Sequence, residues 1–499
     1  MTTSPTPPIE LNGHASHFAG EGVVLDDDFV AAISGICEVV TDDGAIAEAS
    51  RDWWPLALHW SIDGEVPQLA DLVVRPATTQ QVAGVVRACN IARVPLTVAG
   101  GRSGVCGAAV PVHGGVVLDT TALSGVVSVD EPSGIVEVMA GTFGPDLEHR
   151  LREDHGLSVG HFPQSFDLAT VGGWVASRGA GQYSTRYGKI ESMVVGLEFV
   201  LADGTVVVTG GAPAAAVGPD LTQLVLGSEG TLAVITKVWL RTHPLPAHEA
   251  RAAYSFPTFG AGIDACRATL RAGATPAVLR LYDAEESARG RAGDGSTCTL
   301  VVLDEGDQRL VDATMAIVAE SCDAAGGSPA DEALVAEWME HRNDTSALQA
   351  LTRKGFVVDT MEIAAPWSAL SRLFDHVRRA LLAVPTARAA TCHLSHSYSD
   401  GACLYFTFAA TPPANEIEAT YVALWDAGQR AVLAEGGNLS HHHGVGINRA
   451  RFVAEALGNG HGVLQAVKSA LDPQGILNPG KLGLASPFGA SPWPRAKQP

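Results

Sequence analysis

Three consecutive histidines, His441, His442 and His443, lie well inside the chain in the stretch SHHHGVG. Histidine titrates near neutral pH, so it is a common proton carrier and a common metal ligand. One metal ion shared by all three is disfavoured, because neighbouring side chains point to opposite faces of a strand and diverge around a helix. At most two could share an ion, and the nearby sequence offers neither cysteines nor an HExxH pattern. The run therefore predicts a proton-handling site without a metal, and polar loop residues are the alternative.

Glycine is concentrated in three stretches of the first half of the chain, at 100–107, 160–194 and 227–236. The first, GGRSGVCG, lacks both the GxGxxG spacing of a nicotinamide site and the GxxxxGK[ST] pattern of a P-loop. Glycines between two strands still let backbone N–H groups converge on an anion such as a pyrophosphate. Taken alone, the first stretch is equally typical of a tight strand connection. Together the three predict that the backbone approaches a large ligand.

The length, net charge and cysteine content of the chain limit its domain number, its partners and its compartment. A chain of 499 residues predicts two or more domains, and the net charge of −21 argues against a nucleic-acid partner or an anionic membrane surface. We find neither a signal peptide nor an apolar run long enough to span a bilayer, so we expect a cytoplasmic protein without a stable membrane anchor. Eight cysteines without a CxxC pair favour a reducing compartment. The Pro- and Ser-rich ends, 2–8 and 486–499, are expected to be solvated.

The elements that would position the first two glycine stretches form a mixed pattern. The spacing of apolar residues predicts a helix over 78–93, begun by a capping box at Thr78 and Gln81. Strands are expected at 94–100 and 114–119 on either side of the first glycine stretch, and a hairpin over 126–140. A helix is expected near 145–153. Further strands are expected at 192–208 and 232–242. The first half therefore predicts an α+β domain dominated by sheet.

The pattern changes after 243–250, where strands alternate with longer amphipathic helices. Strands are expected at 277–282, 298–303 and 403–409. The helix expected over 366–383 carries one apolar stripe, made of Trp367, Leu370, Leu373, Phe374, Val377, Leu381 and Leu382. Such a helix-backed antiparallel sheet is a common cover for a substrate site.

Several motifs together carry a family resemblance. VVRPATTQQVAGVV, GGRSGVCG, ATVGGWVASRGAG, YGKIESMV and GSEGTLAVIT, in this order, resemble the FAD-binding domain of PCMH-type flavoproteins of the vanillyl-alcohol oxidase superfamily. The stretches GHFPQS and SHHHGVGINR resemble more closely the alkylglycerone-phosphate synthase (alkyl-dihydroxyacetonephosphate synthase) family. The resemblance implies an α+β fold, with a two-lobed PCMH-type FAD-binding domain and an antiparallel-sheet cap domain with covering helices. The segments expected from it are 1–69 at the N-terminus, 70–244 for FAD, 245–430 for the cap, 431–485 completing the flavin site, and a flexible tail at 486–499.

The resemblance also implies which residues surround FAD. Some relatives attach FAD through a histidine of the first loop, where this chain has Ser103, so noncovalent FAD is expected and a thioether to Cys106 is the alternative. The residues expected to bind the cofactor come from the three glycine-rich stretches. They are Gly100, Gly101, Arg102, Ser103, Gly104, Gly107, Gln164, Ser165, Ala169, Thr170, Gly172, Gly173, Ser177, Gly179, Gly181, Glu229, Gly230 and Ile235.

Carried over by position, the resemblance assigns catalysis to the three histidines and to Tyr405 of GACLYFTF, and substrate binding to Arg280 of VLRLYD. Tyr405 alternates with core positions, so a packed tyrosine is the alternative. Arg280 would point away from Leu279 and Leu281, either into a cavity or into a surface salt bridge.

One departure concerns the substrate. Relatives commonly carry an Arg-Asp pair that faces the substrate phosphate, whereas this chain has Gln349 and Ala350 at the matching place. The resemblance implies exchange of the acyl group of a glycerone-type substrate for a long-chain alkoxy group. The alternative is an FAD-linked oxidase or dehydrogenase that takes hydride from an alcohol or 2-hydroxy acid, which the missing arginine favours. In both cases we expect a small-molecule or lipid-like substrate, and a homodimer is compatible with the resemblance.

Overall fold

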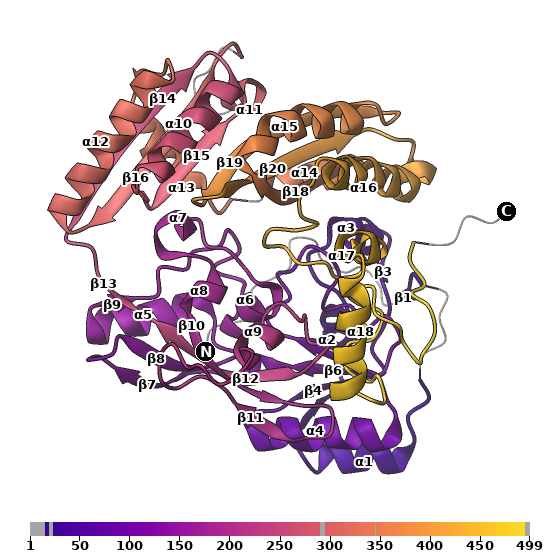
Figure 1. Ribbon diagram of the computed structural model, residues 1–499. Coiled ribbons are helices and arrows are strands. Elements are labelled where there is room, and N and C mark those ends of the chain that lie inside the picture. Colours follow the sequence, from indigo (N-terminus) through magenta and orange to yellow (C-terminus); the bar gives the residue numbers. More distant parts are fainter. Residues whose placement is uncertain (1–14, 19–22, 290–294, 345, 495–499) are drawn as a thin grey trace.

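Two lobes face each other in the computed structural model, which describes residues 15–18, 23–289, 295–344 and 346–494 (Figure 1). The lower lobe in Figure 1 contains a four-stranded and a five-stranded sheet, and the upper lobe contains a seven-stranded sheet. After helix α16 (Ile417–Ala434), the chain returns to the lower lobe and forms α17 (Val453–Leu457) and α18 (Gly460–Leu471). The expected combination of a two-part FAD-type domain with an antiparallel cap is confirmed.

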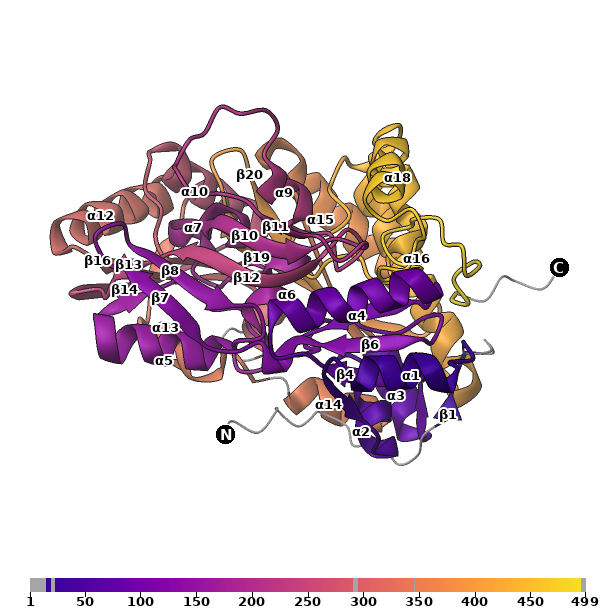
Figure 2. The ribbon, with the colours of Figure 1, turned by 90° about the horizontal axis from the view of Figure 1, so that it is seen from below.

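The four-stranded sheet has the order β2-β4-β6-β5, with β4 (Leu72–Arg75), β6 (Val116–Asp119) and β5 (Leu96–Ala99) parallel and β2 (Glu38–Val40) antiparallel at the edge. Helix α4 (Thr79–Ala92) covers it, and α1 (Asp27–Ser34) packs beside α4 (Figure 2). The Thr78 side chain caps the first turn of α4 by accepting a hydrogen bond from the Gln81 N–H. The helix expected over 78–93 is therefore confirmed, and the first glycine stretch connects β5 to its parallel neighbour β6.

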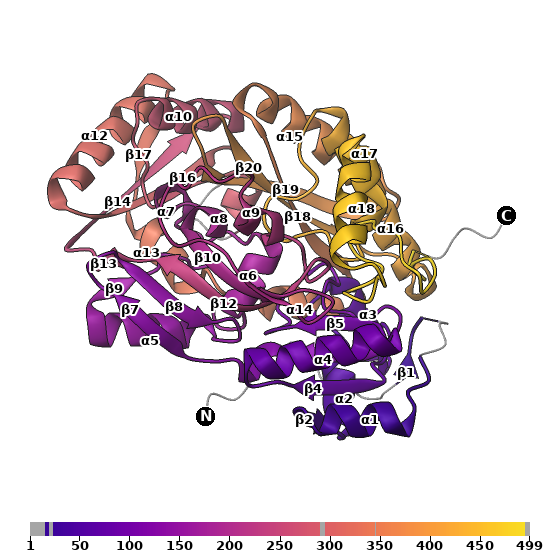
Figure 3. The ribbon, with the colours of Figure 1, turned by 60° about the horizontal axis from the view of Figure 1, so that its bottom comes forward.

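The five-stranded sheet is antiparallel throughout, in the order β11-β10-β12-β8-β7. Its strands are β7 (Val126–Asp130), β8 (Ile135–Met139), β10 (Val194–Val200), β11 (Val206–Val208) and β12 (Val234–Arg241). The expected hairpin over 126–140 is confirmed as β7 and β8, and the helix near 145–153 as α5 (Gly144–His155). The strands expected within 192–208 are β10 and β11, which are joined by a turn at Asp203-Gly204 with Gly204 at φ 82°. Figure 3 shows this sheet beneath the upper lobe.

The seven-stranded sheet of the upper lobe is antiparallel, in the order β17-β14-β16-β15-β19-β20-β18. Its strands are β14 (His248–Phe256), β15 (Val278–Tyr282), β16 (Cys298–Gly306), β17 (Ser328–Ala330), β18 (Val357–Pro366), β19 (Ala387–Ser397) and β20 (Gly401–Ala410). Helices α10 (Phe259–Arg271), α12 (Gln308–Ala324) and α15 (Trp367–Leu382) lie on the side away from the lower lobe (Figure 1). The other face is therefore turned toward the glycine-rich stretches.

The apolar stripe expected on α15 needs one correction. Leu370, Leu373, Val377 and Leu381 are buried against the sheet, but Leu382 is 46% exposed. Adjacent helical residues diverge by about 100°, so Leu381 and Leu382 cannot both face the core.

The remaining elements are short or peripheral. They are α2 (Asp43–Ala49), α3 (Pro55–Ile62), α6 (Val171–Ser177), α7 (Ser184–Tyr187), α8 (Ile190–Met193), α9 (Leu221–Val225), α11 (Ala284–Ala288), α13 (Ala333–His341), α14 (Ser346–Arg353), and the strands β1 (Ala15–Ser16), β3 (Glu65–Val66), β9 (Leu157–Ser158) and β13 (His243–Pro244). Part of the segment expected to be a solvated tail is packed, because Trp493 is buried against Trp54 and donates to Glu418. Among the described helices, none combines the length and the apolar character needed to cross a membrane.

Candidate functional site

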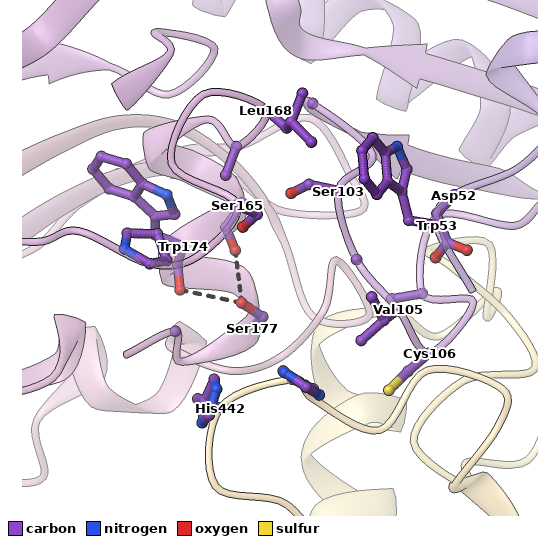
Figure 4. Close-up of a pocket in the computed structure, with 18 of the residues that line it drawn as sticks. Asp52, Trp53, Ser103, Val105, Cys106, Ser165, Leu168, Trp174, Ser177 and His442 are labelled. Carbon is purple, nitrogen blue, oxygen red and sulfur yellow. Dashed lines mark hydrogen bonds between the residues drawn. The ribbon is translucent and has the colours of Figure 1, made fainter. Parts of the chain in front are cut away.

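A pocket between the lobes collects residues from all three glycine-rich stretches and from the cap sheet. Figure 4 shows Ser103 and Val105 of the first stretch on one side, Trp174 and Ser177 on the other, and His442 at the lower edge. The hydroxyl of Ser177 donates within its own helix, to the Gly173 carbonyl at 3.0 Å and the Trp174 carbonyl at 3.4 Å (Figure 4).

The structure brings nearly all of the expected cofactor residues together. Every one of them lines this pocket except Gly107 and Gly181. A Cβ atom on Gly107 would collide with Ile447, and one on Gly181 would lie 2.6 Å from the Phe162 nitrogen. These two glycines therefore permit close packing between chain segments beside the pocket.

Two glycines of the pocket wall face open space, which leaves room for a bound FAD. A Cβ atom on Gly104 would meet only the Asp52 carboxylate, at 3.6 Å, and one on Gly173 only the Thr170 hydroxyl, at 3.3 Å. Longer side chains at these positions would fill the pocket itself. The neighbouring wall residues are small, namely Ser103, Ala108, Ala109, Ala169, Ala176, Ser177 and Ala233. The glycine-rich stretches thus leave a trough of backbone and small side chains, as a long dinucleotide requires.

The cap contributes Arg280 of β15 to the same pocket. One guanidinium nitrogen, Nη2, lies 2.7 Å from His393 Nε2, and His393 Nδ1 lies 3.0 Å from a carboxylate oxygen of Glu286. The Arg280 guanidinium also lies over the rings of Tyr282 and Trp338. The expected orientation of Arg280 toward a cavity therefore agrees with the geometry, and a chain of two further residues holds its position.

Tyr405 of β20 lines the pocket beside Arg280. Its hydroxyl donates to Thr360 Oγ1 at 3.1 Å, and its ring stacks on His393 at 4.7 Å. The His443 ring meets it edge-on at 5.5 Å. Burial raises the pKa of Tyr405 well above its ordinary value, so the side chain is a neutral phenol at physiological pH.

Residues 440–448, which we call the histidine loop, are organised around one buried carboxylate. Glu362 Oε1 accepts hydrogen bonds from the Ser440 hydroxyl at 2.6 Å and from the backbone N–H groups of His442 and His443, at 3.0 and 2.7 Å. The Arg449 guanidinium pairs with the same carboxylate. Burial alone would raise the pKa of Glu362, but Arg449 and the surrounding donors hold it well below its usual range. Glu362 is therefore ionised, and it fixes the loop.

The histidine loop is also tied to the lower lobe. Glu229, of the third glycine-rich stretch, accepts from the N–H groups of Val445 and Gly446 at 2.5 and 2.8 Å. The Cys106 carbonyl accepts from Ile447 and Asn448 at 2.9 and 3.1 Å. The loop thus spans both lobes at the pocket.

The three histidines occupy different environments. His442 and His443 line the pocket, whereas His441 lies behind them with its Nε2 2.7 Å from the Tyr398 hydroxyl. His443 Nδ1 lies 3.2 Å from Glu362 Oε2. Burial lowers the pKa of all three, that of His441 to about 3, so each ring is neutral near pH 7.

Sequence reasoning did not identify Glu362, His393 or His396 as site residues. Glu362 belongs to the stretch EIAAPW, where a lone glutamate next to apolar residues does not indicate a site. His393 and His396 stand in CHLSHS, where a histidine every three residues beside a Ser-Asp-Gly turn was an available signal. Glu286, which orients His393, lies 107 residues away from it along the chain and gave no such signal.

Comparison with known proteins gives the family context. Residues 70–210 match the model of an FAD binding domain, and residues 245–482 match the C-terminal domain of FAD linked oxidases. An uncharacterized FAD-linked oxidoreductase, YgcU, of Escherichia coli O157:H7 is 32% identical, covering 91% of this chain and 97% of the relative. Alkyldihydroxyacetonephosphate synthase of Dictyostelium discoideum is 28% identical over 84% of this chain and 74% of its own.

Solved structures agree on the fold. An alkyldihydroxyacetonephosphate synthase structure is similar with a TM-score of 0.77 at 24% identity, covering 94% of this chain and 89% of that one. p-Cresol methylhydroxylase is similar with a TM-score of 0.72 at 18% identity, covering 92% and 96%. The expectation of FAD as the cofactor is confirmed, and the chain belongs to the family of FAD-linked oxidases with a PCMH-type FAD-binding domain.

Proposed function

We propose that this flavoenzyme oxidises the hydroxyl-bearing carbon of a small 2-hydroxy acid. One observation carries the proposal: among the described residues of the pocket, Arg280 and His443, whose Nδ1 lies 3.2 Å from a Glu362 oxygen, lie on the cap side and face the glycine-rich stretches. An arginine and a base are what a 2-hydroxy acid needs, since it presents one carboxylate and one hydroxyl proton.

Arg280 is suited to bind the carboxylate. Guanidinium carries five N–H donors, and within the described parts of the chain Nη2 alone has a hydrogen-bond partner, His393. The Nε atom is buried without a hydrogen-bond partner among the described residues. An anionic oxygen would satisfy donors that the protein leaves unused, through charge-assisted hydrogen bonds.

His443 is suited to accept the hydroxyl proton. Glu362 lies beside Nδ1, so the carboxylate favours the tautomer with the proton on that atom and leaves the Nε2 lone pair to act as a base. Nδ1 makes no aligned hydrogen bond among the described residues, so Glu362 acts on the ring through its charge at 3.2 Å, and a carboxylate beside a histidine is a recurring general-base arrangement. The neutral phenol of Tyr405 can donate a hydrogen bond to the substrate oxygen if its proton turns away from Thr360 Oγ1, because the Thr360 hydroxyl can then donate to the phenol oxygen.

FAD, when bound along the glycine-rich stretches, would accept the hydride from the carbon. The protein groups then do three things: Arg280 orients the acid, His443 removes the hydroxyl proton, and Tyr405 holds the oxygen as it becomes a carbonyl.

A second candidate is the exchange reaction of the alkylglycerone-phosphate synthases. It is favoured by the presence of Tyr405, Arg280 and the histidine run at the positions that the resemblance assigns. It is disfavoured by charge, because a phosphate carries about two negative charges near pH 7 and gains most from several cations. Among the described residues that line the pocket, the cationic side chains are Arg102, which pairs with Asp119, and Arg280. Arg342 is instead held by Gln182 at 2.8 Å, and the side chain of Gln349 lies outside the described residues.

Anaerobic mixing separates the two reactions. We expect the yellow flavin absorbance to bleach with a 2-hydroxy acid from a panel that also contains primary alcohols and an acyl-glycerone phosphate. Release of fatty acid from the acyl-glycerone phosphate together with incorporation of a long-chain alcohol, without lasting bleaching, would establish the exchange reaction and overturn the proposal.

The variant Arg280→Met tests the role of the arginine. Loss of one or two charge-assisted hydrogen bonds of about 1.5–3 kcal/mol each should lower kcat/KM for the 2-hydroxy acid at least tenfold. The exposed arginine variant Arg309→Met is the matched control and should leave kcat/KM unchanged. Equal loss for a neutral alcohol and for the acid would show that Arg280 does not recognise charge.

A further inference from the structure

A cluster of three histidines adjoins the pocket and has no role in the proposed reaction. His396 of β19 meets His441 and His442 of the histidine loop, and one ring nitrogen from each lies within 4.8 Å of the other two. The Nδ1 atoms of His441 and His442 are 2.8 Å apart. The ring of His396 lies 5.1 Å from that of His441 and 4.9 Å from that of His442.

An irregularity of the cap sheet creates this cluster. The pairing of β19 with β20 shifts between Ser395 and Ser397, so His396 is an extra, unpaired residue in the strand. Its backbone has φ 54°, in the left-handed region that non-glycine residues rarely adopt. Such conformations cost free energy and are found mostly where they serve a site.

The outward nitrogens of two rings are held by hydroxyl groups. His396 Nδ1 lies 2.6 Å from the Ser184 hydroxyl, and His441 Nε2 lies 2.7 Å from the Tyr398 hydroxyl. These contacts fix ring orientation and direct His396 Nε2 and His441 Nδ1 inward, where His441 Nδ1 shares a proton with His442 Nδ1 at 2.8 Å that a bound ion would replace. Metal-binding histidines are held in this manner, by a polar group on the nitrogen that does not bind the ion.

The protonation state of the cluster also suits a cation. Burial lowers the pKa of each ring, most clearly for His396 and His442, so all three are neutral imidazoles with a lone pair to donate. The nearest ammonium group, that of Lys189, donates to the His441 carbonyl at 2.7 Å and is balanced by Glu191 at 3.1 Å.

We propose that His396, His441 and His442 bind one divalent transition-metal ion, with Zn²⁺ as the best match. Three neutral imidazoles with a remaining open position are a recurrent zinc ligand set. The open position would face the pocket, because His396 and His442 line it. The proposal revises the sequence-based expectation of no metal: two neighbouring histidines do share the site, and the third ligand comes from a distant strand.

Metal content tests the proposal without any substrate, so its outcome is independent of the proposed reaction. Tag-free holoenzyme produced with zinc in the medium should retain one zinc per chain after gel filtration, measured by plasma mass spectrometry. His396→Asn should lose it, whereas the half-buried histidine variant His376→Asn, outside the cluster, should keep it. FAD content and circular dichroism of His396→Asn verify folding. Wild-type protein that contains no metal and binds no added Zn²⁺ in calorimetry would overturn the proposal.

Tyr398→Phe provides a second measurement that keeps all three ligands. Removal of the hydroxyl beside His441 should weaken Zn²⁺ about 10- to 100-fold, as loss of such outer partners typically does. If the histidines are only a packing cluster, Zn²⁺ titration will give no saturable heat for either protein, and the proposal fails.

Discussion

Replacing Glu362 with glutamine should disrupt the site from its centre. In the wild-type protein the carboxylate is fully buried and accepts from Ser440, from two backbone N–H groups of the histidine loop and from Arg449. Glutamine preserves the shape but removes the charge. One of its two terminal atoms becomes an N–H₂ group that faces donors, and the guanidinium of Arg449 loses its counterion.

The size of the stability loss in Glu362→Gln follows from the burial of this ion pair. Arg449 and Glu362 are both completely enclosed, and breaking such a pair by removing one partner costs about 3–5 kcal/mol. Because the pKa of Glu362 is held below its unfolded value of 4.5, the stabilisation is fully present above pH 4.5 and is lost only as pH falls through the lower folded pKa. The difference between wild type and Glu362→Gln should therefore stay constant between pH 6 and pH 8.

Urea unfolding, followed by tryptophan fluorescence and by release of FAD, measures this difference. Flavin reduction by a substrate should fall about 10²–10⁴-fold, because His443 loses the group that sets its tautomer. The control is Glu455→Gln, which removes an exposed pair with Arg430 and should change stability by less than about 1 kcal/mol. If Glu362→Gln unfolds at the same urea concentration as this control and keeps wild-type turnover, the carboxylate does not organise the loop.

Three other outcomes are expected. Burial, aided by Lys189, lowers the pKa of His161 from 6.5 to about 3, so the unfolded chain binds one more proton and this residue lowers the stability by about 2 kcal/mol between pH 8 and pH 5. His161→Phe should reduce this pH dependence of the free energy of unfolding in urea titrations, and an unchanged pH dependence would contradict the lowered pKa of His161. The FAD-free Gly104→Leu variant should unfold at the wild-type urea midpoint but bind FAD at least about tenfold more weakly in fluorescence titrations, because the leucine side chain enters the pocket. Full FAD occupancy of this variant would argue against the placement of the cofactor along residues 100–107. Acid precipitation should leave a colourless pellet for wild type and Cys106→Ser alike, and a yellow wild-type pellet that loses its colour in Cys106→Ser would reveal a thioether.

Much of the fold could be predicted because local rules agreed with the final structure. The helix over 78–93 has a capping residue, an apolar stripe and no internal proline, so its sequence is sufficient to define it. The hairpin at 126–140 has alternating residues around a Pro-Ser-Gly turn. The glycine stretches and the histidine run could be found because their composition is unusual, whatever surrounds them.

Strands β18 and β19 were missed for a physical reason. Each carries buried polar residues, such as Asp359 and His393, where a periodic pattern requires apolar ones. Those residues are satisfied by partners far away in sequence: Asp359 accepts from Tyr421 and Trp425, and His393 contacts Glu286. The register shift that presents His396 depends on how two strands pair, which one strand alone cannot indicate.

The bonds of the histidine loop to both lobes have a consequence for how substrate enters. Because the loop is fastened to Glu362 on one side and to Glu229 and the Cys106 carbonyl on the other, the lobes cannot swing open without extracting the histidines. Because separation of the lobes would break these bonds, we expect substrate to reach the pocket through local side-chain movement, with the two lobes staying together. A substrate too large for the space between the lobes would then be excluded by its size, whatever its chemistry.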